Sequence, residues 1–210
     1  MVQTYGVPPE IAGAPMRTVR PIMLRGRYAN PEKELVRMRE RGHIIRIAPG
    51  TYTAKPDTIP AEAPWVPNFE EAAMAYATAH YGNRIPVLYG IGAARFHHAI
   101  PRAIGTTVIA VPQQHRPITL DAGGGRVVFT RTDVNSLDAR YEQGRIGGFL
   151  VTTPEQTLID LLDRPHLGGV PAEAAAAARA LATVIDQDRV DRLVSNRTHV
   201  LQDKVRQYLR

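Results

Sequence analysis

The sequence has no cysteine among its 210 residues, which excludes disulfide bonds, zinc–thiolate sites and cysteine nucleophiles. No stretch approaches the roughly 18 consecutive apolar residues that a membrane-spanning helix needs. The N-terminus also lacks the charged-then-apolar pattern of a signal peptide. We therefore expect a cytoplasmic protein with no membrane partner. The 44% hydrophobic and 22% charged residues are typical of a globular chain with one or two domains.

Lysine is also scarce, with Lys33, Lys55 and Lys204 alone, so arginine carries most of the positive charge. The net charge of +6 is concentrated in residues 17–46, which hold nine basic and three acidic side chains, whereas the remainder holds 17 of each. Arginine suits bidentate contacts to phosphate and guanine. A concentrated basic cluster is the electrostatic footprint of a polyanion, so nucleic acid is the expected partner.

Residues 30–53, NPEKELVRMRERGHIIRIAPGTYT, predict a helix that leads into a tight β-hairpin. Asn30 can cap the first turn, Pro31 suits the first helical position, and Gly42 can end the helix in a left-handed conformation. The β-branched and aromatic runs after Gly42 flank an Ala-Pro-Gly turn. A basic helix followed at once by a hairpin is the layout of a recognition helix and wing.

The expected helix has one basic side. At 100° per residue, Lys33, Arg37 and Arg41 fall on one stripe, and Leu35 and Met38 lie away from it, toward a core. The charge pattern of this helix, taken alone, is also typical of a solvent-exposed helix whose basic and acidic side chains form salt bridges. The charge of the wider window favours DNA binding. The predicted DNA-binding residues are Arg17, Arg20, Arg25, Arg27, Lys33, Arg37, Arg41 and Arg46.

Residues 54–67 contain four prolines, which prevent a helix and favour an extended linker, with Trp65 docking it on the second domain. The sequence therefore predicts an α+β protein with two domains: a winged helix-turn-helix over 1–62, and a mixed α+β domain with a helical C-terminal tail over 63–210. We expect 68–210 to fold alone. The expected helices are 68–82, 89–99, 153–162, 172–184, 187–195 and 198–209, and the strands are 106–111, 118–121, 126–131 and 148–151.

No pattern predicts catalysis, a metal site or a cofactor. The glycines at 123–125 separate two expected strands, so a hairpin turn is favoured over a phosphate-binding loop. His97 and His98 are adjacent and would point about 100° apart on a helix, which suits chelation poorly. We expect one at the edge of the core and the other in solvent. Asp186 and Asp188 are interpreted as the acidic start of a helix.

Three blocks in order resemble the AbiEi-type antitoxins of bacterial toxin–antitoxin operons. The first is LVRMRERGHIIRIAPGTY, the second PVLYGIGAARFHHAI, and the third VTTPEQTLIDLLDRP. The resemblance spans roughly residues 31–165. Members usually carry arginine where this chain has Gln156, so the resemblance does not imply an essential charge at that position.

The resemblance implies a winged helix-turn-helix domain that represses its own operon at inverted repeats in double-stranded DNA. It also implies a C-terminal domain that neutralises a nucleotidyltransferase-like toxin, with no enzymatic activity and no cofactor. A winged-helix transcriptional regulator that responds to a small molecule, with no toxin partner, is the alternative. A toxin-like neighbouring reading frame would favour the antitoxin.

Overall fold

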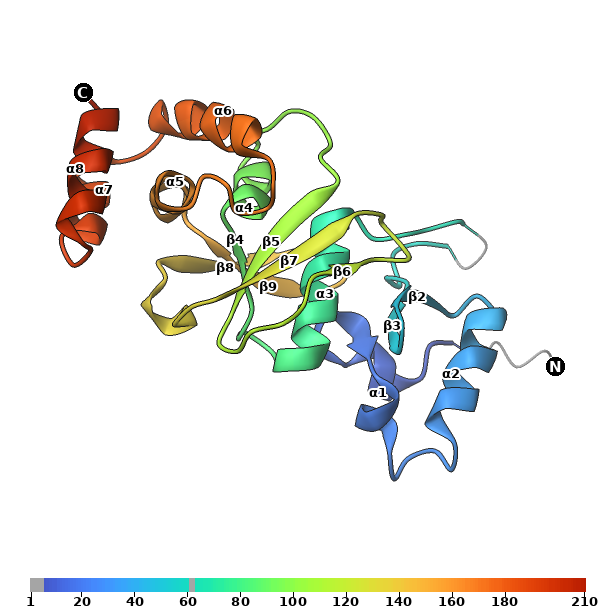
Figure 1. Cartoon of the computed structure of the whole chain (residues 1–210). Coiled ribbons are helices and arrows are strands. Elements are labelled where there is room, and N and C mark those ends of the chain that lie inside the picture. The colour runs from blue at the N-terminus through green and yellow to red at the C-terminus, as the bar shows by residue number, and fades with distance from the viewer. Residues whose placement is uncertain (1–5, 61–62) are drawn as a thin grey trace.

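The computed structural model describes residues 6–60 and 63–210, which form two sheets with helices around them (Figure 1). Residues 6–60, here called the N-terminal region, form a small three-stranded antiparallel sheet with strand order β1-β3-β2. Its elements are α1 (Pro9–Ala12), η1 (Pro15–Arg17), β1 (Thr18–Val19), η2 (Pro21–Leu24), α2 (Pro31–Glu40), β2 (Ile44–Ala48) and β3 (Thr51–Ala54).

The α2 helix begins and ends where the sequence predicts. The Asn30 side chain accepts a hydrogen bond from the Lys33 amide at 3.0 Å, so it caps the first turn. Gly42 has φ 75° and donates to the Arg39 carbonyl, while the next amide reaches the Met38 carbonyl at 3.0 Å. This pair of bonds is a Schellman ending. Leu35 and Met38 are buried, so the predicted apolar side of the helix is confirmed.

Residues 63–210, the C-terminal region, are built on a six-stranded mixed sheet with strand order β6-β7-β5-β4-β9-β8. Its strands are β4 (Val87–Tyr89), β5 (Thr106–Val111), β6 (Ile118–Thr119), β7 (Arg126–Arg131), β8 (Ala139–Gln143) and β9 (Gly148–Thr152). Its helices are α3 (Phe69–Tyr81), α4 (Ile91–Phe96), η3 (Val134–Ser136), α5 (Pro154–Asp163), α6 (Pro171–Ala182), α7 (Gln187–Val194) and α8 (His199–Tyr208). In the described ranges, no helix has the length and apolar character required to cross a bilayer.

The two faces of the sheet carry separate cores. On β4, Leu88 belongs to the core around α3, whereas Val87 and Tyr89 belong to the core that α5 to α8 cover. On β5, Ile109 belongs to the core around α3 and Val108 to the core under α5 to α8. Successive side chains on a strand point to opposite faces, so a strand covered on both faces is apolar throughout.

The α3 helix is buried on every side from Phe69 to Thr78. The sequence predicts the burial of only one side, with Phe69, Ala72 and Tyr76 among its residues. The other sides are buried because α3 lies between the sheet and the N-terminal region (Figure 1). The helix begins where the sequence predicts, and Asn68 caps it by accepting a hydrogen bond from the Glu71 amide at 2.8 Å.

Met16 anchors the N-terminal region on the C-terminal region. It is 3% exposed, has φ 51°, and packs in the α3 core together with Ile47 and Ala48. The Asp121 amide also donates to the Ile47 carbonyl at 2.8 Å. The two regions therefore share a buried apolar core. The boundary between 62 and 63 remains a prediction, and separating the chain there would expose Met16, Ile47 and Ala48 to water.

We expect Gly147→Ala to destabilise the protein by about 2–4 kcal/mol. Gly147 has φ 141°, and a Cβ there would lie 2.9 Å from the Met16 Cα, so both the backbone and the contact between the regions would be strained. The measurement is the free energy of unfolding by denaturant. Gly105→Ala is the control, because a Cβ at Gly105 meets open space. Equal stability of the two variants would contradict this account of the contact.

Candidate functional site

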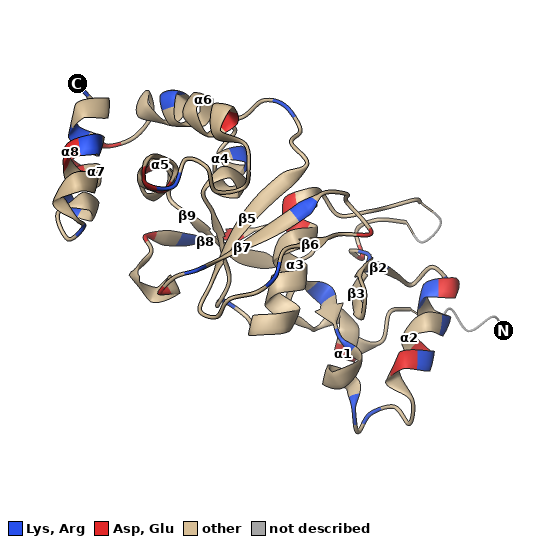
Figure 2. Cartoon of the chain, in the orientation of Figure 1, with Lys and Arg blue, Asp and Glu red and all other residues tan. Residues whose placement is uncertain are grey.

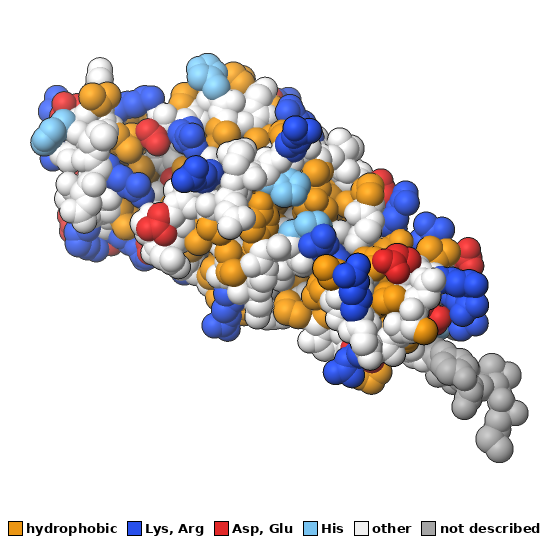
Figure 3. All heavy atoms as spheres, turned by 60° about the horizontal axis from the view of Figure 1, so that its bottom comes forward, with side chains coloured by type: hydrophobic (Ala, Val, Ile, Leu, Met, Phe, Trp, Pro, Cys, Tyr) orange, Lys and Arg blue, Asp and Glu red, His pale blue; other side chains and the backbone are white. Residues whose placement is uncertain are grey.

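The predicted basic stripe of α2 faces solvent. Lys33, Arg37 and Arg41 are all exposed. Figure 2 shows basic residues along α2 and on the loop that precedes it. That loop contributes the exposed Arg25 and Arg27. The surface is mixed, because acidic groups lie beside the basic ones on this end of the molecule (Figure 3).

Two of the predicted DNA-binding arginines pair with carboxylates that are distant in sequence. Arg17 donates to both oxygens of Asp57, at 3.0 and 2.7 Å, and its side chain is only 15% exposed. Arg46 lies 2.7 Å from the carboxylate of Asp121 in the C-terminal region. The geometry therefore gives both arginines a structural role in holding the fold together.

Arg37 and Arg20 occupy intermediate positions. Arg37 lies 3.4 Å from Glu34 one turn earlier on α2, and pairs of this kind on a helix surface contribute only a few tenths of a kcal/mol. Arg20 is partly buried near His80 of α3. Burial lowers the pKa of His80, and the charge of Arg20 lowers it further. The structure thus brings Arg25, Arg27, Lys33, Arg37 and Arg41 to the surface around α2.

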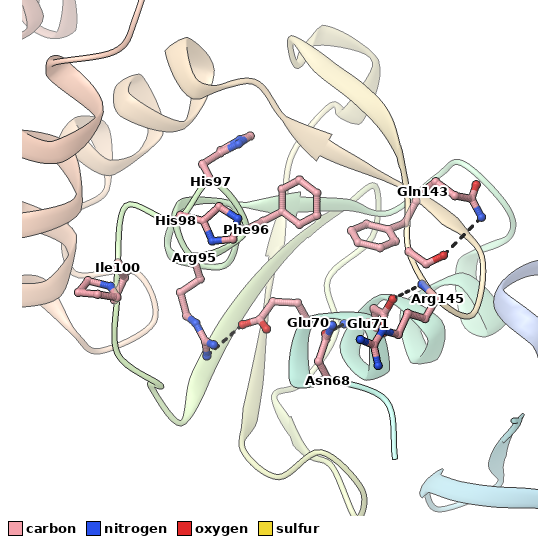
Figure 4. Close-up of a pocket in the computed structure, with 13 residues that line it drawn as sticks. Asn68, Glu70, Glu71, Arg95, Phe96, His97, His98, Ile100, Gln143 and Arg145 are labelled. Atoms are coloured by element: carbon pink, nitrogen blue, oxygen red, sulfur yellow. Dashed lines mark hydrogen bonds and ion pairs between the residues drawn. The ribbon is translucent and has the colours of Figure 1, made fainter. Parts of the chain in front are cut away.

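A cavity of about 1070 Å³ lies in the C-terminal region, among the start of α3, the end of α4 and the turn between β8 and β9 (Figure 4). Two consecutive buried carboxylates, Glu70 and Glu71, come from α3. Arg95, Phe96 and His97 come from α4 and the residue after it. Figure 4 shows Arg95 of α4 reaching Glu70 of α3 and the turn at Arg145 lying beside Glu71, whereas His97 points away from them.

The two glutamates are held differently. Glu71 accepts the Arg145 amide through Oε1, while its Oε2 has no hydrogen-bond partner. Glu70 lies 3.2 Å from Arg95, and burial raises the pKa of its carboxyl while the charge of Arg95 opposes that rise. Both residues lie in the acidic first turn of α3. No spacing signals that the β8–β9 turn closes over them.

The two histidines divide as predicted. His97 is half-buried, its Nε2 lies 2.7 Å from the Thr152 carbonyl oxygen, and burial lowers the pKa of its ring. His98 is exposed, with φ 60°. Across residues 6–60 and 63–210, no cluster of three or more His, Cys, Asp or Glu side chains has the geometry to hold a metal ion.

The sequence over residues 87–210 matches the AbiEi antitoxin C-terminal domain. The chain belongs to the AbiEi antitoxin family. The matched part of this antitoxin begins at β4 and runs through α8. AbiEi proteins are antitoxins of toxin–antitoxin systems and not a family of enzymes, and the predicted family is confirmed.

A solved structure among those that match has a similar fold over almost the whole antitoxin. It is the RV2827C protein from Mycobacterium tuberculosis, with a TM-score of 0.61 and 18% sequence identity. The alignment covers 95% of this chain and 75% of that one. It therefore includes the N-terminal region as well as the matched domain. No curated protein matches the chain.

Proposed function

We propose that this chain is an antitoxin that binds operator DNA through residues 1–62 and represses its own operon, while residues 63–210 neutralise a nucleotidyltransferase-like toxin. The DNA is double-stranded and carries inverted repeats. The protein acts in the cytoplasm, without a cofactor and without catalysis. The exposed basic residues around α2 contact the duplex: Arg25, Arg27, Lys33, Arg37 and Arg41.

The arrangement of the N-terminal region supports this proposal. The elements follow the order helix, strand, short helix, α2, β2 and β3, and β1 pairs with β3 at the edge of the hairpin. A helix that follows a shorter helix and precedes a hairpin has the place of a recognition helix with its wing. The observation that carries the proposal is the solvent-facing stripe of Lys33, Arg37 and Arg41 in a chain of the antitoxin family.

We expect Lys33→Ala and Arg37→Ala to weaken binding to operator DNA more than binding to random duplex. Lys33 extends from the first turn of α2 and Arg37 from its last turn, on the same exposed side. Exposed side chains of a recognition helix contact base edges. The loss of a bidentate base contact should cost about 1–3 kcal/mol on the operator alone. Binding is measured by fluorescence anisotropy on both duplexes at one salt concentration.

Two controls accompany these variants. Arg206→Ala removes a charge of similar exposure on α8 and should leave both affinities unchanged. Both α2 variants should still restore growth against the neighbouring toxin, although they no longer repress a promoter–reporter fusion. Equal losses on operator and random DNA would move the recognition element to residues 17–27. Failure to restore growth would contradict the proposed division between the two regions.

The large cavity supports a second candidate function. Its volume of about 1070 Å³ suits a small molecule, which fits a winged-helix regulator with no toxin partner. Co-purification with the product of the neighbouring gene decides between the two. Capture of a toxin-like nucleotidyltransferase supports the antitoxin, and an enzyme or transporter gene in that position supports the regulator.

A further inference from the structure

A second, smaller cavity lies on the opposite face of the sheet from α3. Its volume is about 300 Å³, and its lining is almost entirely polar. Tyr89 ends β4, Arg131 ends β7, Arg164 follows α5, and Arg197 lies between α7 and α8. Four elements that are distant in sequence thus deliver three guanidinium groups and a phenol to one small space.

The three arginines have no carboxylate partner. Within the described residues, no ion pair involves Arg131, Arg164 or Arg197. Arg164 donates to the hydroxyl of Thr130, which is neutral. Guanidinium groups gathered around a small cavity repel one another unless a negative charge lies among them. Asp160 and Asp163 also line the cavity, but neither forms an ion pair with these guanidinium groups.

Asp160 does not supply that charge. It is 4% exposed and lines the cavity. Its Oδ1 accepts from the Gln156 amide nitrogen at 2.7 Å, and its Oδ2 has no partner. Burial raises the pKa of this carboxyl to about 8, so it is mostly protonated at neutral pH. A protonated carboxyl donates a hydrogen bond. Asp163, on the same cavity, is exposed to solvent.

We propose that this cavity binds a phosphate group of a small ligand, held by the guanidinium groups of Arg131, Arg164 and Arg197. Guanidinium groups match the oxygen geometry of phosphate. The volume admits one phosphate with its nearest substituents and not a duplex. A bound phosphate would join the α7–α8 connection to α5 and to the end of β7.

The test is the phosphate dependence of the melting temperature of the full chain, compared with sodium chloride at equal ionic strength. Saturating inorganic phosphate should raise the melting temperature by on the order of 5 °C. Arg164→Gln and Arg197→Gln should each abolish the rise, whereas Arg206→Gln, which removes a charge of α8 outside the cavity, should keep it. Calorimetric titration with phosphate should give one site per chain.

Three outcomes would overturn the proposal. The first is a rise that chloride reproduces, and the second is a rise that both cavity variants retain. The third is displacement of phosphate by duplex DNA, which would assign the arginines to the nucleic-acid surface. Competition between a nucleoside triphosphate and inorganic phosphate for the cavity would support a small ligand as the occupant. If Arg164→Gln fails to fold, the exposed Arg131→Gln provides the same comparison through the titration.

Discussion

Operator binding should weaken about 200-fold when the salt concentration rises from about 100 to about 300 mM. Arg25, Arg27, Lys33, Arg37 and Arg41 are exposed around α2. Each phosphate contact contributes a slope of about −0.9 to log K against log[salt]. The 17–46 window holds nine basic residues, of which Lys33 and Arg37 are assigned to base edges and two are held by carboxylates. The other five supply about five phosphate contacts, which predict a slope of roughly −4.5 to −5. The measurement is an anisotropy titration at four or five salt concentrations.

The ion pairs of Arg17 and Arg46 sharpen this expectation. Replacement of Arg25 or Arg41 by alanine should each reduce the magnitude of the salt slope by about 1. Since Arg17 and Arg46 already face carboxylates, their replacement by alanine should change the slope by less. A slope flatter than about −2 for the unmodified protein would refute the basic surface as the DNA-binding site.

Asp160→Asn should remove a large pH dependence of stability. The pKa of the Asp160 carboxyl is raised to about 8 by burial, from an ordinary value of 3.8. Between these values the unfolded chain loses the proton and the folded chain keeps it, so the folded state is progressively destabilised as the pH rises from about 4 to about 8. The free energy of unfolding of Asp160→Asn, minus that of the original protein, should therefore increase by on the order of 4–6 kcal/mol from the low to the high end of that pH range.

The free energy of unfolding in urea, measured from about pH 4.5 to about pH 8.5, checks this. Asp163→Asn is the matched control, because that carboxyl lies on the same helix and is exposed. The difference in the free energy of unfolding between Asp163→Asn and the original protein should not grow in the same way. A constant difference for Asp160→Asn across the range would mean that the buried carboxyl ionises with an ordinary pKa.

Capping and turn signals placed most of the secondary structure. Asn30 is the predicted cap of α2, and it accepts a hydrogen bond from the backbone amide three residues later. Asn68, Thr153 and Asp186 cap their helices in the same way. The glycines at 123–125 all have positive φ and form the expected turn. These signals are local, since a cap needs only its own first turn, and so they can be recognised without knowledge of the tertiary contacts.

Three strands, β1, β4 and β8, escaped prediction, and the fold gives the physical reason for the last two. β4 has three residues, and the glycine after it opens α4, so the sequence predicts one helix over 89–99. β8 has the sequence ARYEQ at the edge of the sheet, where one neighbour suffices and no apolar run is required. Both strands form because β9 pairs with them across long sequence separations.

The cavities could not be predicted, because their residues come together only through the fold. Glu71 meets the turn at Arg145, and Arg164 and Arg197 gather beside Tyr89. Gln156 is a partial exception. The sequence suggests that no essential charge is needed at this position, and its neutral amide bonds the buried carboxyl of Asp160. The sequence identifies this residue but not its partner.

The insertion of Met16 into the α3 core limits how the proposed repressor can read its operator. A DNA-binding domain on a flexible linker can bind half-sites at many separations. Here the N-terminal region is held at one orientation by Met16, Ile47 and the ion pair of Arg46 with Asp121. Two copies on an inverted repeat would then present their α2 helices at one separation. Insertion of about five base pairs between the half-sites would turn one of them to the far side of the duplex.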